Sequence, residues 1–317
     1  MRPLLVSHPV FRAHRPPPGH PERPERLDAV LRGLAPLAFT PHAAPAAADD
    51  AILRAHTPEL LAHLQSAAAE ARREGFAALD PDTYLSPDSF EAARRAAGGA
   101  LSAVEQVLAG GAPGAFCVLR PPGHHAEPDR AMGFCLLNSI AIAALHALDA
   151  LGCPRVAVLD LDVHHGNGTQ SVAEREPRLL FASVHQAPLY PGTGDPSEHG
   201  PHGNVRNITL PPGAAGPAWR PAVAQALAWL AAGEPALLLV SLGFDGHARD
   251  PLANWALHDA DFAWAGRHLR TACAAPVVAL LEGGYDLSAL ESASRAFASG
   301  LWNALEEEDG MGGGEQA

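Results

Sequence analysis

Two kinds of apolar segment alternate along the chain, and their lengths distinguish them. Short aliphatic runs predict buried strands, at Pro3–Ser7, Ala115–Leu119, Arg155–Leu161, Leu179–Val184, Ala236–Leu242 and Pro276–Leu281. Longer stretches rich in Ala and Leu lie between them and predict helices, at Pro24–Leu34, Asn138–Leu151, Pro217–Ala232, Asp259–Cys273 and Leu287–Leu305. This alternation predicts a mainly parallel sheet with helices on both faces.

Two further helices are predicted from their start signals. Ser86 is followed by a proline, which favours an N-cap with proline in the first helical position, and the helix can run to the glycine pair that begins at Gly110. Thr57 is also followed by a proline. We therefore expect the side chains of Ser86 and Thr57 to cap helix N-termini.

The length of the chain allows either two domains or one large one. The chain has 317 residues, 47% of them hydrophobic, and shows no internal repeat and no long polar linker. We expect one domain over residues 1–305 and a disordered, acidic and Gly-rich tail over 306–317. Four cysteines, none in a CxxC pair, are expected to be reduced core residues. The N-terminal apolar run is too short for a secretory signal, and no segment approaches the roughly 18 apolar residues of a membrane span, so we expect a cytoplasmic protein.

The charged residues exclude several functions. There are 22 basic and 35 acidic residues, which gives a net charge of −13, and every basic residue is an arginine. Without lysine the chain has no P-loop lysine, no Schiff-base residue and no attachment point for pyridoxal phosphate. No block of basic residues is present to contact phosphate groups, so we expect no nucleic-acid partner.

Polar side chains gather where one predicted strand ends. The strand at Arg155–Leu161 runs into a segment with Asp160, Asp162 and His164 at alternate positions. Side chains two apart in an extended chain share a face, so we expect these three to point the same way. Two carboxylates and an imidazole favour a bound cation, and this ligand set suits Zn²⁺, Mn²⁺ or Fe²⁺. The alternative is a polar strand end satisfied by hydrogen bonds alone.

Three other strand ends carry candidate groups. His124 and His125 follow the second predicted strand, and imidazole is the usual acid-base group near neutral pH, although a surface turn is the alternative. Asp245 follows the fifth strand, and Tyr285 follows two glycines after the sixth. Ligands of parallel sheets bind at the carboxyl ends of the strands, so we expect these groups to share one site.

Six segments resemble the successive signatures of the histone deacetylase superfamily, which includes bacterial acetoin-utilisation proteins and acetylpolyamine amidohydrolases. They read RPPGHHA, MGFCLLN, DLDVHHGNGTQ, SVHQAPLYPGTGD, GFDGHARDPL and LEGGYD, in the expected order. The earlier GHPERPERL resembles the bacterial and class II branch. The resemblance extends from His8 to about Leu305. It implies the arginase/deacetylase fold, an α/β catalytic domain with an eight-stranded, mainly parallel sheet flanked by helices.

The resemblance implies a role for each strand-end group. Three side chains resemble the ligands of one catalytic zinc ion per chain, namely Asp162, His164 and Asp245. His124 and His125 resemble a catalytic histidine pair, in which Asp160 supports the first ring and Asn167 the second. A neutral Asn167 should leave His125 less basic than a carboxylate would. Tyr285 resembles the phenol that donates a hydrogen bond to the developing oxyanion.

Other residues resemble parts of a substrate tunnel and an ion site. The walls and rim of the tunnel are expected at Asp82, Gly133, Phe134, Tyr190 and Leu252. Relatives also suggest a K⁺ ion near Asp160, Ser183 and Val184. A polyamine enzyme should need acidic groups at the rim, whereas Leu252 is apolar, so we favour acetyl-lysine or another small acetylated amine as substrate. The oligomeric state stays open.

Together these expectations describe a zinc-dependent deacetylase that releases acetate and a free amine. Two alternatives stay open. An arginase- or agmatinase-type hydrolase of the same fold would hold two metal ions and would need additional aspartates. The second alternative is not an enzyme: a deacetylase-like protein that binds acylated ligands without turnover. Every residue that the chemistry needs is present, which argues against it.

Overall fold

The computed structural model describes residues 1–302. The tail expected over 306–317 and the end of the helix expected to reach Leu305 lie outside the described residues, and the domain boundary at residue 305 stays a prediction.

Within residues 1–302, eight parallel strands form the central sheet, in the order β2-β1-β5-β10-β9-β6-β7-β8. Their bounds are β1 Leu4–Ser7, β2 Thr40–Ala43, β5 Gly114–Cys117, β6 Val156–Asp160, β7 Leu179–Gln186, β8 Val205–Leu210, β9 Leu237–Leu242 and β10 Val277–Leu281. A short antiparallel hairpin, β3 Ala77–Ala78 with β4 Tyr84–Leu85, lies outside this sheet. The predicted α/β fold with an eight-stranded parallel sheet is confirmed.

Two strands of the central sheet, β2 and β8, were not predicted by the apolar pattern, and they lie at its two edges. Strand β2 is mostly exposed and contains Pro41, which edge strands tolerate because one side of the strand needs no hydrogen bonds. Strand β8 begins with alternating buried and half-buried residues, and its last residues are all half-buried. The central strands are buried on both faces and therefore read as continuous apolar runs.

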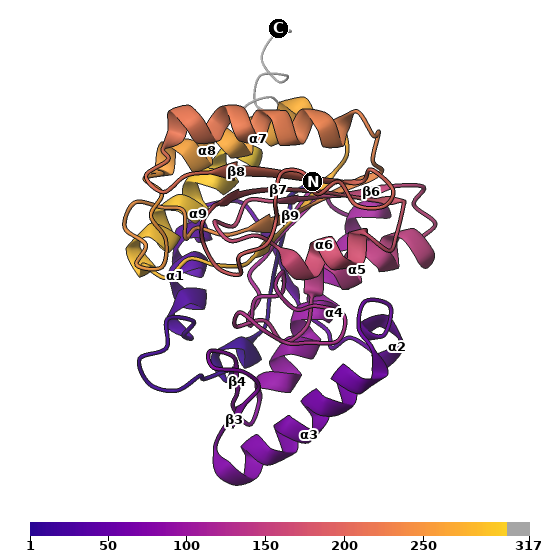
Figure 1. The fold of residues 1–317 in the computed structure, drawn as a ribbon, viewed down its shortest axis with the longest axis vertical. Coiled ribbons are helices and arrows are strands. Elements are labelled where there is room, and N and C mark those ends of the chain that lie inside the picture. Colours follow the sequence, from indigo (N-terminus) through magenta and orange to yellow (C-terminus); the bar gives the residue numbers. More distant parts are fainter. Residues whose placement is uncertain (303–317) are drawn as a thin grey trace, which may run out of the picture.

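Helices cover both faces of the sheet (Figure 1). On one side lie α7 Gly216–Ala231, α8 Asp259–Ala272, α9 Leu287–Trp302 and α1 Glu25–Leu34, of which α8 packs against α9 and α9 against α1. On the other lie α4 Ser89–Leu108, α5 Ser139–Asp149 and α6 Asn167–Ala173. Helix α3, Pro58–Glu74, extends away from the sheet beside the β3-β4 hairpin, and two short helical segments, η1 Pro9–Arg12 and α2 Asp49–Ile52, complete the chain.

One of the two predicted Ser/Thr caps is confirmed and the other is wrong. The Thr57 hydroxyl accepts a hydrogen bond from the backbone N–H of Leu60 at 3.2 Å and caps α3. Helix α4 begins only at Ser89, and the Ser86 hydroxyl accepts from the backbone N–H of Arg15 instead. Because Ser86 contacts the N-terminal segment, the turn at 86–88 stays outside the helix.

The four cysteines are buried free thiols, as the sequence predicted. In the described part of the chain, no helix is long and apolar enough to cross a membrane.

Candidate metal and catalytic site

The candidate groups follow four neighbouring central strands. His124 and His125 come after β5, Asp162 and His164 after β6, Asp245 after β9, and Tyr285 after β10. The strand order places β10 between β5 and β9, with β6 on the far side of β9. Because these strands are parallel, their carboxyl ends share one edge of the sheet, and the groups converge there.

Asp162, His164 and Asp245 form a compact cluster whose ligand atoms all lie within 4.8 Å of one another. Nδ1 of His164 lies 3.0 Å from Oδ1 of Asp162 and 3.1 Å from Oδ2 of Asp245. Burial alone would lower the pKa of His164, but the hydrogen bonds and charges of the two aspartates raise it to about 10. The cluster therefore stabilises positive charge between two buried carboxylates, as a cation site must.

The backbone holds the outer oxygens of the two aspartates. Oδ2 of Asp162 accepts from the N–H of Gly283 at 2.8 Å, and Oδ1 of Asp245 accepts from the N–H of Val163 at 3.0 Å. A Cβ atom at Gly283 would collide with the Asp245 carboxylate, so only glycine fits at this point. These contacts leave one oxygen of each aspartate facing His164.

Asp160 does not join this cluster, although the alternation along the sequence predicted that it would point the same way as Asp162. Strand β6 ends at Asp160, and the chain turns directly after it. Its carboxylate instead accepts from Nδ1 of His124 at 3.0 Å and from the backbone N–H of Asp162 at 3.1 Å. Asp160 thus supports the histidine pair.

The two histidines differ in their partners and in their pKa values. Burial opposes protonation of His124, but the carboxylates of Asp160 and Asp162 outweigh it and raise the pKa of His124 to about 10. Nδ1 of His125 contacts the amide oxygen of Asn167 at 2.8 Å. Burial, followed by the charges of His124 and His164, holds the pKa of His125 well below its ordinary value. The surroundings therefore favour the protonated form of His124 and the neutral form of His125.

Tyr285 is buried and is held through its backbone and its ring. Its N–H donates to Oδ2 of Asp250 at 2.6 Å, and the guanidinium carbon of Arg26 lies 4.8 Å from the centre of its ring. Arg26 pairs with the buried Glu22 and also donates to the backbone oxygen of Gly284. These contacts fix the turn that carries the phenol.

Sequence reasoning assigned no role to Arg26, Asp250 or Glu282. Oε2 of Glu282 accepts from the backbone N–H groups of Gly123 and His124, at 2.6 and 3.2 Å, so it fixes the histidine loop. All three residues lie inside the motifs GHPERPERL, GFDGHARDPL and LEGGYD, which is the signal that could have identified them.

Three of the expected tunnel residues border the catalytic groups. The Phe134 ring lies 5.8 Å from the Tyr285 ring, and the Tyr190 ring lies 5.2 Å from the His125 ring, both edge to face. Gly133 packs directly against the imidazole of His125. Together they surround the approach to His125 and Tyr285.

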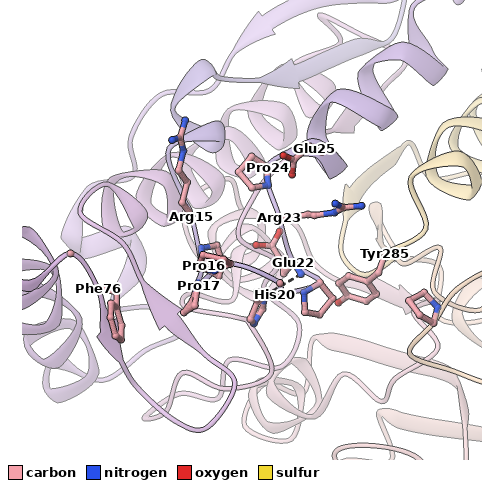
Figure 2. A pocket seen from close by; sticks show the side chains of 15 residues that line it. Arg15, Pro16, Pro17, His20, Glu22, Arg23, Pro24, Glu25, Phe76 and Tyr285 are labelled. Carbon is pink, nitrogen blue, oxygen red and sulfur yellow. Dashed lines mark hydrogen bonds between the residues drawn. The ribbon is translucent and has the colours of Figure 1, made fainter.

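A cavity of about 980 Å³ opens beside Tyr285. Figure 2 shows Tyr285 facing it from one side, with His20 and a run of prolines on the other. The backbone oxygen of Asp82 contacts Nε2 of His20 at 3.0 Å, which places Asp82 behind the wall of this cavity. Leu252 is half-buried and is not part of the cavity lining, although its neighbour Pro251 is.

The residues of the expected K⁺ site lie on adjacent strands. Ser183 is opposite Asp160 in the register of β6 and β7, and its hydroxyl contacts Nδ1 of His185 at 2.9 Å. Val184 is fully buried on the same strand. The ion itself stays a prediction.

Comparisons with known proteins agree on one family. The model of the histone deacetylase domain matches residues 20–301. A probable deacetylase of Methanothermobacter thermautotrophicus is 39% identical over 94% of this chain and 90% of its own length. A histone deacetylase-like amidohydrolase of Pseudomonas aeruginosa is 39% identical over 89% of this chain and 77% of its own. The crystal structure of an acetylpolyamine aminohydrolase from Burkholderia pseudomallei superposes with a TM-score of 0.86 at 30% identity, covering 94% of this chain and 98% of its own.

Proposed function

Since the chain belongs to the histone deacetylase family, we propose that it is a zinc-dependent amidohydrolase that removes acetyl groups from acetyl-lysine or a small N-acetylated amine. One observation carries the proposal: the buried cluster of Asp162, His164 and Asp245 adjoins the imidazole of His125 and lies close enough to Tyr285 for the charges of Asp245 and Asp162 to raise the pKa of its phenol. An amide hydrolase needs this combination, with a cation for the carbonyl oxygen, a base for water and a donor for the oxyanion.

Asp162, His164 and Asp245 would hold the zinc ion through two carboxylate oxygens and one imidazole nitrogen, a ligand set typical of catalytic rather than structural zinc. When bound, zinc supplies a Lewis acid that polarises the amide carbonyl and acidifies water. His125 is neutral and accepts the proton of the attacking water at Nε2, because its Nδ1 donates to Asn167. His125 then returns that proton to the leaving amine, while His124 stays cationic and stabilises the negative charge that develops nearby.

Tyr285 donates its phenol hydrogen to the oxyanion of the tetrahedral intermediate. Burial and the nearby carboxylates outweigh the opposing charge of Arg26 and raise the pKa of Tyr285 well above its ordinary value, so the phenol keeps its proton at neutral pH. The products are acetate and the free amine, and the proton taken from water ends on the amine.

The proposal is tested by metal analysis and by a deacetylation assay on an acetyl-lysine peptide. Wild type should bind one zinc ion per chain and release acetate. Tyr285→Phe should keep its zinc and lose about 10²- to 10³-fold in kcat, as at other oxyanion sites. Asp245→Asn should lose zinc and activity together. Near-normal turnover by Tyr285→Phe would contradict the oxyanion role, and full zinc content in Asp245→Asn would contradict the ligand role.

The metal count also separates the alternatives. Within residues 1–302, one cluster of histidine and acidic side chains has the spacing of a metal site, which supports one ion rather than the two of an arginase-type enzyme. Two bound ions would favour the arginase-type hydrolase. A protein that binds zinc and acetylated ligands but releases no acetate would favour the non-catalytic alternative.

Within the deacetylase class, the choice between substrates depends on the side chains at the rim of the expected substrate tunnel. The apolar Leu252, which we expect at the rim, favours acetyl-lysine over a polyamine. Asp80 and Asp82 lie close together beside His20, and burial together with Asp80 raises the pKa of Asp82. These acidic groups suit a substrate that carries a distant positive charge. We therefore propose a panel of acetyl-lysine peptides, acetylated polyamines and longer acyl-lysines, with a zinc-chelating hydroxamate as the inhibition control.

A further inference from the structure

The side-chain amide of Asn167 has two different neighbours. On one side its Oδ1 contacts Nδ1 of His125 at 2.8 Å, and on the other its Nδ2 donates to Oε1 of Glu127 at 2.8 Å. The same Nδ2 also lies 3.3 Å from the backbone oxygen of His125 and 3.4 Å from the sulfur of Met132. Every one of these partners of Nδ2 is a hydrogen-bond acceptor.

This arrangement gives the Asn167 amide only one favourable orientation. Turning it by half a rotation would place Oδ1 against the Glu127 carboxylate and the His125 carbonyl, which are acceptors as well. A buried amide oxygen that faces a carboxylate loses its hydrogen bond and is repelled by the charge. Glu127 therefore determines that Oδ1, and not Nδ2, faces His125.

The orientation of the amide in turn determines the tautomer of His125. An amide oxygen can only accept, so Nδ1 of His125 has to carry the hydrogen. The lone pair of a neutral ring then lies on Nε2, on the opposite side of the ring from Asn167. The neighbouring His124 receives the same support directly, from the carboxylate of Asp160 at 3.0 Å.

We propose that Glu127 is a positioning residue for amide hydrolysis, which acts through Asn167 to hold His125 as the Nε2 base. This inference rests on the proposed amidohydrolase function. It also explains how a neutral asparagine serves the second histidine: the chain places a carboxylate one hydrogen bond further away.

The surroundings of Glu127 support this role. Its backbone oxygen contacts Nδ1 of the buried His56 at 3.0 Å, which fixes the main chain at this point. Its second carboxylate oxygen pairs with the exposed Arg130 at 3.1 Å. The carboxylate is thus held between a surface arginine and a buried amide, with Oε1 directed at Asn167.

The first test removes the carboxylate. Glu127→Ala should lower kcat by roughly 10- to 100-fold, the usual cost of losing a supporting hydrogen bond at such sites, and leave KM unchanged. In an Asn167→Ala background the same substitution should change kcat by less than about two-fold, because the relay is already broken. Arg130→Ala is the matched control, since it removes only the surface partner of Glu127, and its kcat should stay within about two-fold of wild type. Equal losses from Glu127→Ala in both backgrounds would overturn the proposal.

The second test asks whether Glu127→Gln, which should lower kcat in wild type, raises kcat when residue 167 is an aspartate. Asn167→Asp places two carboxylates side by side without a hydrogen between them, so it should lower kcat. Adding Glu127→Gln supplies an N–H donor to the new aspartate and should raise kcat about 10-fold or more, although Glu127→Gln alone lowers the kcat of wild type. A double variant no more active than Asn167→Asp would contradict the relay.

Two measurements separate this role from general damage and from failure of the proposed function. Zinc content and melting temperature should stay at wild-type values in the Glu127 variants. In ¹⁵N spectra, with the His125 signals assigned through a His125→Gln variant, wild type should carry the ring hydrogen on Nδ1, and Glu127→Ala should lose that preference. An unchanged tautomer would overturn the inference. A wild-type protein inactive on every acetamide would contradict the proposed function, while the spectra would still report on the relay.

Discussion

At the scale of single residues, the position of the His125 ring depends on a glycine, because a side chain at Gly133 would overlap the imidazole. Gly133 has a φ angle of 57°, and a Cβ atom there would lie 2.6 Å from Cδ2 of His125. Tyr190 meets the same imidazole edge to face, with 5.2 Å between the ring centres. The base is therefore enclosed by backbone at Gly133 and by an aromatic ring, and its position depends on both.

We predict that Gly133→Ala lowers kcat about 10-fold or more, because the methyl group displaces the His125 ring by a distance that catalytic geometry does not tolerate. The matched control is Gly203→Ala, because Gly203 has a similar φ of 66° but no neighbouring atom within 4 Å of the point that a Cβ would occupy. Gly203→Ala should lose about 1 kcal/mol of stability from the backbone strain, and Gly133→Ala should lose more because it also displaces the buried imidazole. Steady-state kinetics and urea unfolding check this, and equal activities of the two variants would contradict it.

The residue scale also shows what the sequence could predict of the site. The pattern of strand ends predicts that Asp162, His164 and Asp245 lie at one edge of the sheet, but it also groups Asp160 with them, and only the family resemblance singles out the three that cluster. The contact of Arg26 with the Tyr285 ring joins residues 26 and 285, and neither residue's local pattern contains any sign of the other. Glu127 was missed for a different reason, since its role depends on the orientation of an amide.

At the scale of elements, similar start signals lead to different structures. Thr57 and Ser86 are each followed by proline, yet only Thr57 caps a helix. The difference is tertiary, because Ser86 contacts both Arg15 and Ala13 of the N-terminal segment. Likewise, the central strands were predicted because they are buried on both faces, while the edge strands β2 and β8 show no continuous apolar run.

We predict that Thr57→Ala lowers the free energy of unfolding by about 1 kcal/mol, the usual value of a helix N-cap, and leaves kcat unchanged. Thr57→Ser keeps the hydroxyl and should lose less than half as much. Urea unfolding monitored by circular dichroism measures both. Equal losses would show that the methyl group of Thr57, rather than its hydrogen bond to Leu60, stabilises α3.

At the scale of the whole molecule, neutral histidines are built into the interior. Burial lowers the pKa of His56 and of His165 to about 4, and that of His185 to about 3. His165 and His185 lie with their ring centres 4.8 Å apart, so protonation of either one opposes protonation of the other. The fold therefore contains several bases that resist protonation while folded and accept protons readily once unfolded.

We predict that stability falls as the pH decreases from about 6.5 to about 4. In this window the unfolded chain binds more protons than the folded one, so lower pH favours unfolding, whereas above pH 6.5 this contribution is fully present. In the metal-free protein, His165→Gln should reduce the slope of unfolding free energy against pH. The exposed His63→Gln should leave the slope unchanged. Equal slopes for both variants would contradict this account.

The position of β10 has a consequence for how the protein is made. This strand is the last of the sheet to be synthesised, yet it lies in the centre, between β5 and β9. Until residues 277–281 emerge from the ribosome, the histidine loop after β5 and the aspartate after β9 belong to two half-sheets with no strand to join them. Before β10 is made, the three metal-ligand candidates share one half-sheet, because β6 pairs with β9, but the histidine pair lies on the other half-sheet and the phenol of Tyr285 is missing. The groups that the proposed hydrolysis needs therefore come together only after β10 and Tyr285 have been synthesised.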